Sequence, residues 1–201
     1  IDMVAGPSEV LVIADETARA HYVAADLLSQ AEHDRLASAV LLTTSAALAR
    51  MVDAEIVRQT GYLSRSEIME CSLRDFGCAV VCASLDQAAE LANEIAPEHL
   101  EIMTARPRDL LPAIKNAGAV FLGAWSPEPL GDYLAGPNHV LPTSGTARFF
   151  SPLSVDSFLK TMSVIEYSRD TLAPVKDRII ALAETEKLTA HANSIRVRFE
   201  D

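Results

Sequence analysis

The stretch GPSEVLVIADETARAHYVAADLLSQAEHDRLASAVLLT (residues 6–43) joins two short apolar runs through a helical pattern. The runs EVLVIA (Glu9–Ala14) and SAVLLT (Ser38–Thr43) lack the alternation of a half-exposed strand, so each predicts a strand buried on both faces. Residues 17–32 between them predict a helix, with Asp15 as its N-terminal cap. A strand, a helix and a second buried strand in this order favour parallel pairing.

The same pattern continues to residue 122. Further strands are expected at residues 78–83, 100–104 and 119–122, and further helices at 45–61, 65–76, 84–95 and 108–116. Ser45 is a candidate cap for the first of these helices, and Gly61 suits a left-handed end to it. Ser84 and Gln87 have the spacing of a capping box.

These elements predict an α/β fold. We expect residues 1–122 to form a parallel sheet with helices on both faces, an incomplete Rossmann-like domain. In an open sheet of this kind, functional loops are expected at the carboxyl ends of the strands.

The chain changes character after residue 122. Residues 123–152 hold five of the ten prolines and four of the eight glycines, which predicts a long Pro/Gly-rich loop. Apolar and aromatic residues run through it and favour an ordered loop. We expect residues 123–168 to form an active-site loop that returns to the core, with a short helix or strand at 155–167. Residues 169–201 predict a helical C-terminal tail, in which a helix over 172–195 is broken.

Composition narrows the function classes. The 201 residues are 49% hydrophobic and 22% charged, as in a packed protein. The formal net charge of −11 disfavours nucleic acid and anionic membranes as partners, and no apolar run reaches the ~18 residues of a membrane span.

The cysteines and the start of the chain bear on its setting. Cys71, Cys78 and Cys82 form no disulfide framework, and the last two are expected to be buried thiols. A cytoplasmic setting fits such cysteines, and the opening without Met predicts a piece of a longer protein.

Two pairs of residues have spacings that suit metal binding or acid–base catalysis. Gln30 and His33 fall on one helix face and could share a divalent metal, although such pairs are also common in ordinary helices. Glu98 and His99 follow Pro97 at a helix end, where an imidazole and a carboxylate could serve as an acid–base pair. A solvated turn is the alternative interpretation of that pair.

Other candidates have weaker patterns. Asp132 and His139 lie on the Pro/Gly-rich loop as candidate ligands, or as residues of ordinary turns. Glu186 and His191 would point ~140° apart on one regular helix. Ser8 precedes the first strand without the G-x-S-x-G context of a nucleophile. The chain has neither G-x-G-x-x-G nor a Walker A loop, so it predicts no nucleotide site of its own.

Five phrases along the whole chain resemble the histidinol dehydrogenase family. They are IDMVAGPSEVLVIAD (residues 1–15), DLLSQAEHD (26–34), APEHLE (96–101), GDYLAGPNHVLPT (131–143) and LTAHANSIRVR (188–198). Each phrase is moderately specific, and the five in family order are very specific. The resemblance covers about the C-terminal half of the family's usual length.

The resemblance implies a zinc-dependent enzyme that oxidises L-histidinol to L-histidine through bound histidinal with two NAD. It implies zinc ligands at Gln30, His33, Asp132 and His191. It implies an acid–base pair in which His99 accepts the alcohol proton and Glu98 activates water. The implied substrate contacts are Ser8, His99, Glu186 and the zinc ligands, with a less defined role for His139.

The family is homodimeric, and the tail of one protomer completes the site of its partner. That arrangement would account for Glu186 and His191, since the tail need not obey the geometry of one helix. Because the first half of the family's length is missing, the chain alone is expected to be inactive. Two other classes stay open: a metal-dependent hydrolase that uses Glu98 to activate water, and a non-catalytic ligand-binding module.

Overall fold

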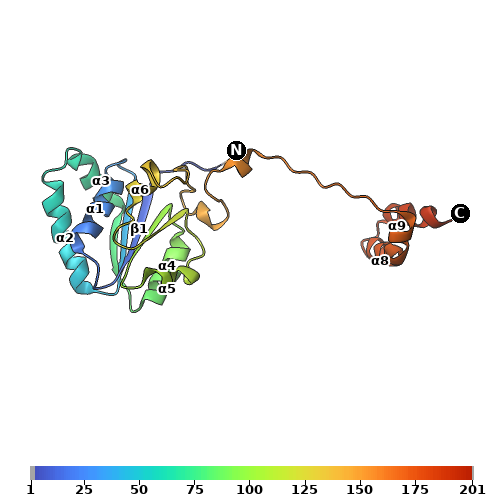
Figure 1. Cartoon of the computed structure of the whole chain (residues 1–201), viewed down its shortest axis with the longest axis horizontal. Coiled ribbons are helices and arrows are strands. Elements are labelled where there is room, and N and C mark those ends of the chain that lie inside the picture. The colour runs from blue at the N-terminus through green and yellow to red at the C-terminus, as the bar shows by residue number, and fades with distance from the viewer. Residues whose placement is uncertain (1–2, 201) are drawn as a thin grey trace. The chain divides into compact units, whose positions relative to one another are not determined.

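The computed structural model describes residues 3–200 and divides into two units after Phe158. The first unit is built on a five-stranded parallel sheet of order β3-β2-β1-β4-β5 (Figure 1). Its strands are β1 (Glu9–Ala14), β2 (Ser38–Thr43), β3 (Gly77–Val81), β4 (His99–Met103) and β5 (Ala119–Leu122). This order matches five strands of a Rossmann sheet, so the predicted α/β fold is confirmed.

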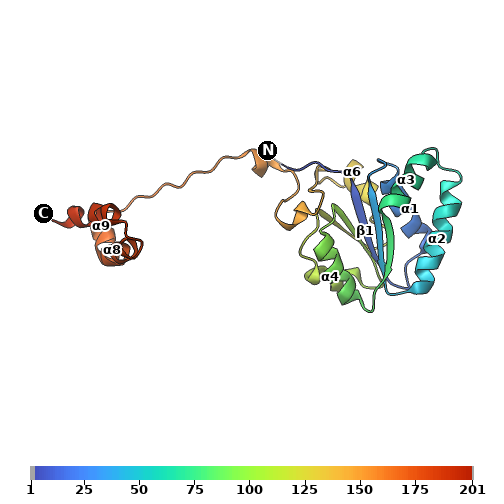
Figure 2. The ribbon, with the colours of Figure 1, turned by 180° about the vertical axis from the view of Figure 1, so that it is seen from behind.

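Helices cover both faces of the sheet (Figures 1 and 2). They are α1 (Ala20–Ala31), α2 (Ala46–Thr60), α3 (Ser66–Phe76), α4 (Leu85–Ile95) and α5 (Pro107–Leu110), with a 3-10 turn at Leu111–Ala113. Val12 and Leu41 face a core shared with α1 and α2. Ile13, Leu42 and Ile102 face a second core shared with α4. Two-sided burial is the reason these strands do not alternate.

The helix ends differ in part from the prediction. Ser45 caps α2 by accepting a hydrogen bond from Leu48 N at 3.2 Å, as expected. Asp15 does not cap α1, because its carboxylate accepts from Thr17 N and from Ala105 N instead. Gly61 ends α2 with φ −64°, so the predicted left-handed stop is wrong.

Helix α4 leads directly into β4, the strand that begins at His99. Ser84 Oγ accepts from Gln87 N, but the Gln87 side chain accepts from Ala83 N rather than from Ser84, so the capping box forms only in part. Ala96 ends the helix in a left-handed conformation, φ 54°. This turn leads through Pro97 straight into β4.

The edge strand β3 overturns one burial prediction. Within residues 3–200 it pairs only with β2, and Cys78 on it is exposed, whereas Cys82 just after it is buried as expected. A strand with one neighbour leaves side chains at the rim of the core, which the apolar run CAVVCA did not indicate. All three cysteines are free.

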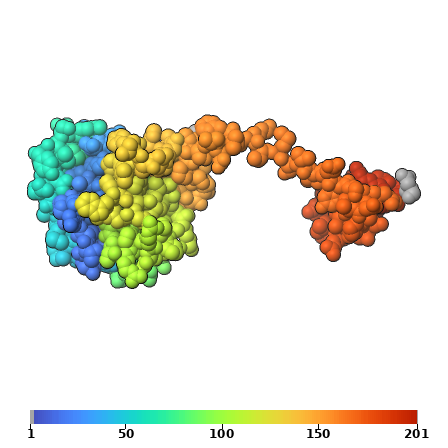
Figure 3. Space-filling model, viewed as in Figure 1, coloured from blue at the N-terminus to red at the C-terminus, as the bar shows by residue number. Residues whose placement is uncertain are grey.

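The segment after β5 lies on the surface of the first unit, in yellow in Figure 3. It contains a helix that the sequence did not predict, α6 (Glu128–Tyr133), which starts between two prolines. It also returns to the start of the chain, where Gly6 N donates to Thr143 Oγ1 at 2.7 Å. Of residues 155–167, only Val155–Phe158 form a 3-10 turn, so most of the predicted short element is wrong.

The second unit is helical. Its elements are α7 (Arg169–Leu172), α8 (Lys176–Thr185) and α9 (Thr189–Arg196), with 3-10 turns at Ala173–Val175 and Val197–Phe199. The expected break lies between α8 and α9, where Lys187 has φ 62°. Ala183 and Ala192 are buried within this unit. No helix of the described residues is both long enough and apolar enough to span a bilayer.

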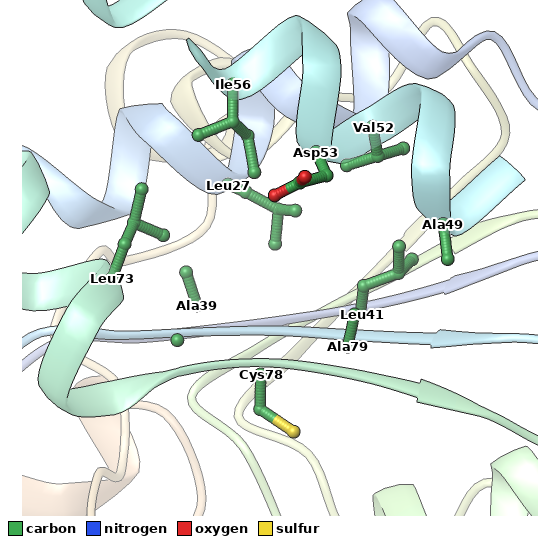
Figure 4. A pocket seen from close by; sticks show the side chains of 11 residues that line it. Leu27, Ala39, Leu41, Ala49, Val52, Asp53, Ile56, Leu73, Cys78 and Ala79 are labelled. Carbon is green, nitrogen blue, oxygen red and sulfur yellow. The ribbon is translucent and has the colours of Figure 1, made fainter.

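A cavity of about 220 Å³ lies between the sheet, α2 and α3 (Figure 4). Its lining is mainly apolar, with Leu41 of β2 below and Ile56 of α2 above, and Asp53 pointing toward it. No candidate site residue lines this cavity.

Candidate functional site

The candidate catalytic pair lies at the amino ends of the strands. His99 is the first residue of β4, opposite Ala119 at the start of β5. Gln30 lies in the last turn of α1, which returns from the carboxyl end of β1 to the same amino edge. The expectation that functional loops lie at the carboxyl ends is therefore wrong for these residues. Strand starts and the ends of the preceding helices share the amino edge.

Glu98 is fixed by an exchange of hydrogen bonds with the start of β1. Glu9 N donates to Glu98 Oε2 at 2.9 Å, and Glu98 N donates to Glu9 Oε2 at 3.3 Å. The Glu98 residue is only 6% exposed. Burial raises its pKa to about 8, and the nearby charges of Glu9 and Asp132 act in the same direction. Glu98 is therefore a carboxyl group whose proton is exchanged near physiological pH.

The ring of His99 has one engaged and one open nitrogen. Nδ1 lies 3.0 Å from the carbonyl oxygen of Glu9, which fixes Nδ1 as the protonated atom and leaves a lone pair on Nε2. Nε2 is buried without a hydrogen-bond partner and lies 3.8 Å from Asp132 Oδ1. Burial lowers the pKa of His99. The imidazole is thus neutral near pH 7 and can accept a proton at Nε2.

Gln30 presents an amide that the fold leaves unused. The side chain is fully buried, and neither Oε1 nor Nε2 has a hydrogen-bond partner. An unpaired buried amide costs about 1–3 kcal/mol, so its oxygen is suited to a ligand that the structure does not contain. His33, three residues on, is exposed.

Three side chains converge at the same place. Among the described residues, ligand atoms of His99, Glu128 and Asp132 lie within 4.8 Å of one another. Burial and the charge of Asp132 raise the pKa of Glu128 to about 7. A divalent cation would offset these like charges, and imidazole and carboxylate groups are zinc ligands. The side chains of this cluster are therefore chemically compatible with zinc.

The remaining predicted residues lie apart from this convergence. Ser8 is half-buried just before β1. His139 is exposed on the loop after α6. Glu186 and His191 are exposed in the second unit, at the end of α8 and within α9. Their roles stay predictions.

Four acidic residues of the site were missed by sequence reasoning: Glu9, Asp26, Glu101 and Glu128. One signal was present, because Glu101 interrupts the apolar strand HLEIM and is 1% exposed. A charged residue in the middle of a fully buried strand needs a polar partner.

Gly118 allows β5 to approach the catalytic pair. Its N–H donates to the carbonyl of Pro97 at 2.9 Å, and a Cβ at this position would lie 2.5 Å from the carbonyl oxygen of Glu98. We expect Gly118→Ala to lower the free energy of unfolding by about 1–3 kcal/mol, because backbone cannot move aside cheaply. Urea denaturation measures this. Gly61→Ala is the matched control, since that site has φ −64° and no contact below 3.4 Å. Equal effects of the two substitutions would contradict the prediction.

Comparison with known sequences identifies the family. The sequence model described as histidinol dehydrogenase matches residues 1–199. The chain belongs to the histidinol dehydrogenase family. It is 66% identical over 199 residues to the histidinol dehydrogenase of Caldanaerobacter subterraneus subsp. tengcongensis, covering 99% of this chain and 46% of that protein. The enzyme of that name from Clostridium acetobutylicum is 60% identical over 200 residues, covering 100% of this chain and 46% of its relative.

A structural comparison gives the same family as the sequence comparison. The crystal structure of histidinol dehydrogenase from Elizabethkingia anophelis superposes with a TM-score of 0.92 at 40% identity, over 99% of this chain and 46% of that one. The predicted membership in the histidinol dehydrogenase family is confirmed. The chain spans about half the length of the relatives that it matches.

Proposed function

We propose that the full-length protein oxidises L-histidinol to L-histidine through bound histidinal, reducing two NAD, as the last step of histidine biosynthesis. The observation that supports this most is the convergence of His99 and Asp132 beside Glu98, at the buried amino edge of a sheet from this family. This chain would supply the metal site and the acid–base pair. Residues outside it would supply much of the NAD site.

We propose zinc ligands at Gln30, His33, Asp132 and His191. Gln30 offers a buried oxygen donor and Asp132 a half-buried one, and His33 follows Gln30 on the same helix face. Zinc would orient the substrate through its amine and imidazole and hold the reacting carbon near the nicotinamide. Substrate contacts are expected from Ser8, His99, Glu186 and the four ligands, with His139 nearby.

In the first oxidation, His99 accepts the alcohol proton at Nε2 while hydride leaves the carbinol carbon for NAD. The Glu9 carbonyl holds Nδ1–H and so keeps the lone pair on Nε2 directed into the site. In the second oxidation, Glu98 in its ionised form removes a proton from water, which attacks the aldehyde carbon. The hydrate then loses a second hydride to give the carboxylate.

We also propose the assembly of the site. Residues 1–122 form its α/β base, residues 123–168 bring Asp132 to it, and residues 169–201 pack on a partner protomer in a homodimer. His191 and Glu186 would enter the partner's site in this way. The three free cysteines suit a protein of the reducing cytoplasm.

The decisive experiment follows reduced-nicotinamide absorbance with the purified full-length protein, zinc, L-histidinol and NAD. We expect two NAD reduced per histidine formed. The 201-residue chain alone should reduce none, because the relatives of this name are about twice as long. Zinc-dependent turnover that needs no NAD would contradict the proposal and indicate a hydrolase.

Metal binding is tested separately by Gln30→Leu in the full-length protein. Removing an oxygen atom that binds the metal directly should weaken zinc affinity by at least about 10-fold. Relieving the unpaired buried amide should at the same time keep or raise the Tm of the metal-free protein. Competition with a chelator measures the affinity, and zinc affinity equal to that of the wild type would remove Gln30 from the ligand set.

A further inference from the structure

Glu101 is a buried carboxyl that the proposed reaction does not use. It lies two residues after His99 on β4, so both side chains are on the same face of the sheet. It is the middle residue of β4, paired with Val12 and Phe121 in the neighbouring strands. A carboxyl at such a buried position requires a polar partner.

One oxygen holds the start of α6. Glu101 Oε1 accepts a hydrogen bond from Glu128 N at 2.9 Å, and this contact is fully buried. Glu128 is the first residue of α6, and Asp132 lies one turn further on the same helix. The bond that Glu101 makes therefore holds the start of the helix that carries Asp132, 3.8 Å from His99 Nε2.

The start of α6 is also tied to α1. The hydroxyl of Ser29, the neighbour of Gln30 on α1, donates to Glu128 Oε2 at 3.3 Å. Glu101 Oε2 is buried and has no hydrogen-bond partner. The elements bearing Gln30, His99 and Asp132 thus meet at Glu128, whose N–H is held by Glu101.

We propose that Glu101 is a positioning residue whose carboxyl group holds the start of α6 on β4 and thereby sets the position of Asp132 at the metal site. The ligand assignment in this proposal rests on the proposed function. The tie itself rests on the contacts of Glu101.

The contact with Glu128 N needs only an acceptor oxygen at residue 101. Glutamine has the same shape as glutamate and accepts at Oε1, so it should keep this contact. Methionine is of similar size and has no comparable acceptor, so it should lose the contact.

The test compares Glu101→Gln with Glu101→Met in the full-length protein. Zinc affinity is measured by chelator competition, and the visible spectrum of the Co²⁺-loaded protein reports ligand geometry. We expect Glu101→Gln to stay within about 3-fold of the wild type and Glu101→Met to lose about 10- to 100-fold with a changed spectrum. Ile102→Ala on the opposite face of β4 is the control: it should lower Tm and leave affinity and spectrum unchanged.

Wild-type affinity in Glu101→Met, or equal losses in Glu101→Gln and Glu101→Met, would overturn the proposal.

Crystal structures separate this proposal from the proposed function. The 3.8 Å approach of Asp132 to His99 should persist in Glu101→Gln and be lost in Glu101→Met, whether or not metal is bound. A wild-type protein that binds no zinc would end the proposed function, and an undisturbed Asp132 in Glu101→Met would end this one.

Discussion

Replacing His99 with asparagine should lower kcat by about 10²- to 10⁴-fold, the usual contribution of a general base. The asparagine amide can still donate to the carbonyl of Glu9, as Nδ1–H does in the wild type. It has no counterpart of Nε2, so the atom that accepts the alcohol proton is lost. The measurement is steady-state NAD reduction by the full-length protein, together with the zinc content of each preparation.

Zinc content should remain that of the wild type, because His99 is placed in proton transfer rather than among the four proposed ligands. His21→Asn is the matched control, since His21 is an exposed residue at the start of α1. Unchanged turnover in His99→Asn would remove His99 from catalysis. Loss of zinc together with turnover would place it among the ligands, as its approach to Glu128 and Asp132 within 4.8 Å allows.

The sheet was predictable because its central strands are buried on both faces. EVLVIA and SAVLLT were expected to be strands over the residues that form β1 and β2. The position of β3 at the edge was not predictable, since an apolar run does not encode how many neighbours a strand has. Cys78 was placed in the interior for that reason.

The catalytic pair was found from the phrase APEHLE, but its surroundings were not. Glu98 and His99 are buried because Ala96 turns α4 into β4 and Glu9 of β1 bonds to both of them. These contacts join residues about 90 positions apart, and local pattern does not record them. The expected carboxyl-edge location failed for the same reason, since the edge on which a residue lies depends on the return path of the chain.

Glu98→Gln should separate the two oxidations. Glutamine keeps an oxygen that accepts from Glu9 N but cannot take a proton from water. Single-turnover reactions that start from histidinol should still reduce the first NAD, while reactions that start from histidinal should slow by about 10²-fold or more. Equal losses from the two starting compounds would contradict a role confined to the second oxidation.

The same substitution should stabilise the metal-free protein at alkaline pH. The pKa of Glu98 is about 8 in the folded state against a usual value of 4.5, so folding retains a proton that the unfolded chain releases. The stabilisation from this proton is complete below pH 4.5 and is lost as the pH rises toward 8, where the ionised carboxylate is buried near Asp132 and Glu128. The difference between these two pKa values sets an upper limit of about 5 kcal/mol on the stabilisation. Relaxation of the protein and penetration of water reduce it.

We therefore expect Glu98→Gln to exceed the wild type in unfolding free energy by about 1–3 kcal/mol at pH 8.5, and by progressively less as the pH falls to 4.5. Urea denaturation in the presence of a chelator measures this at a series of pH values. Glu94→Gln on the exposed end of α4 is the matched control and should show no such trend. A gain in stability with a loss of the second oxidation would mean that the fold keeps a costly carboxylate at Glu98 for its chemistry. A pH-independent difference between the two proteins would show that Glu98 ionises as it does in water.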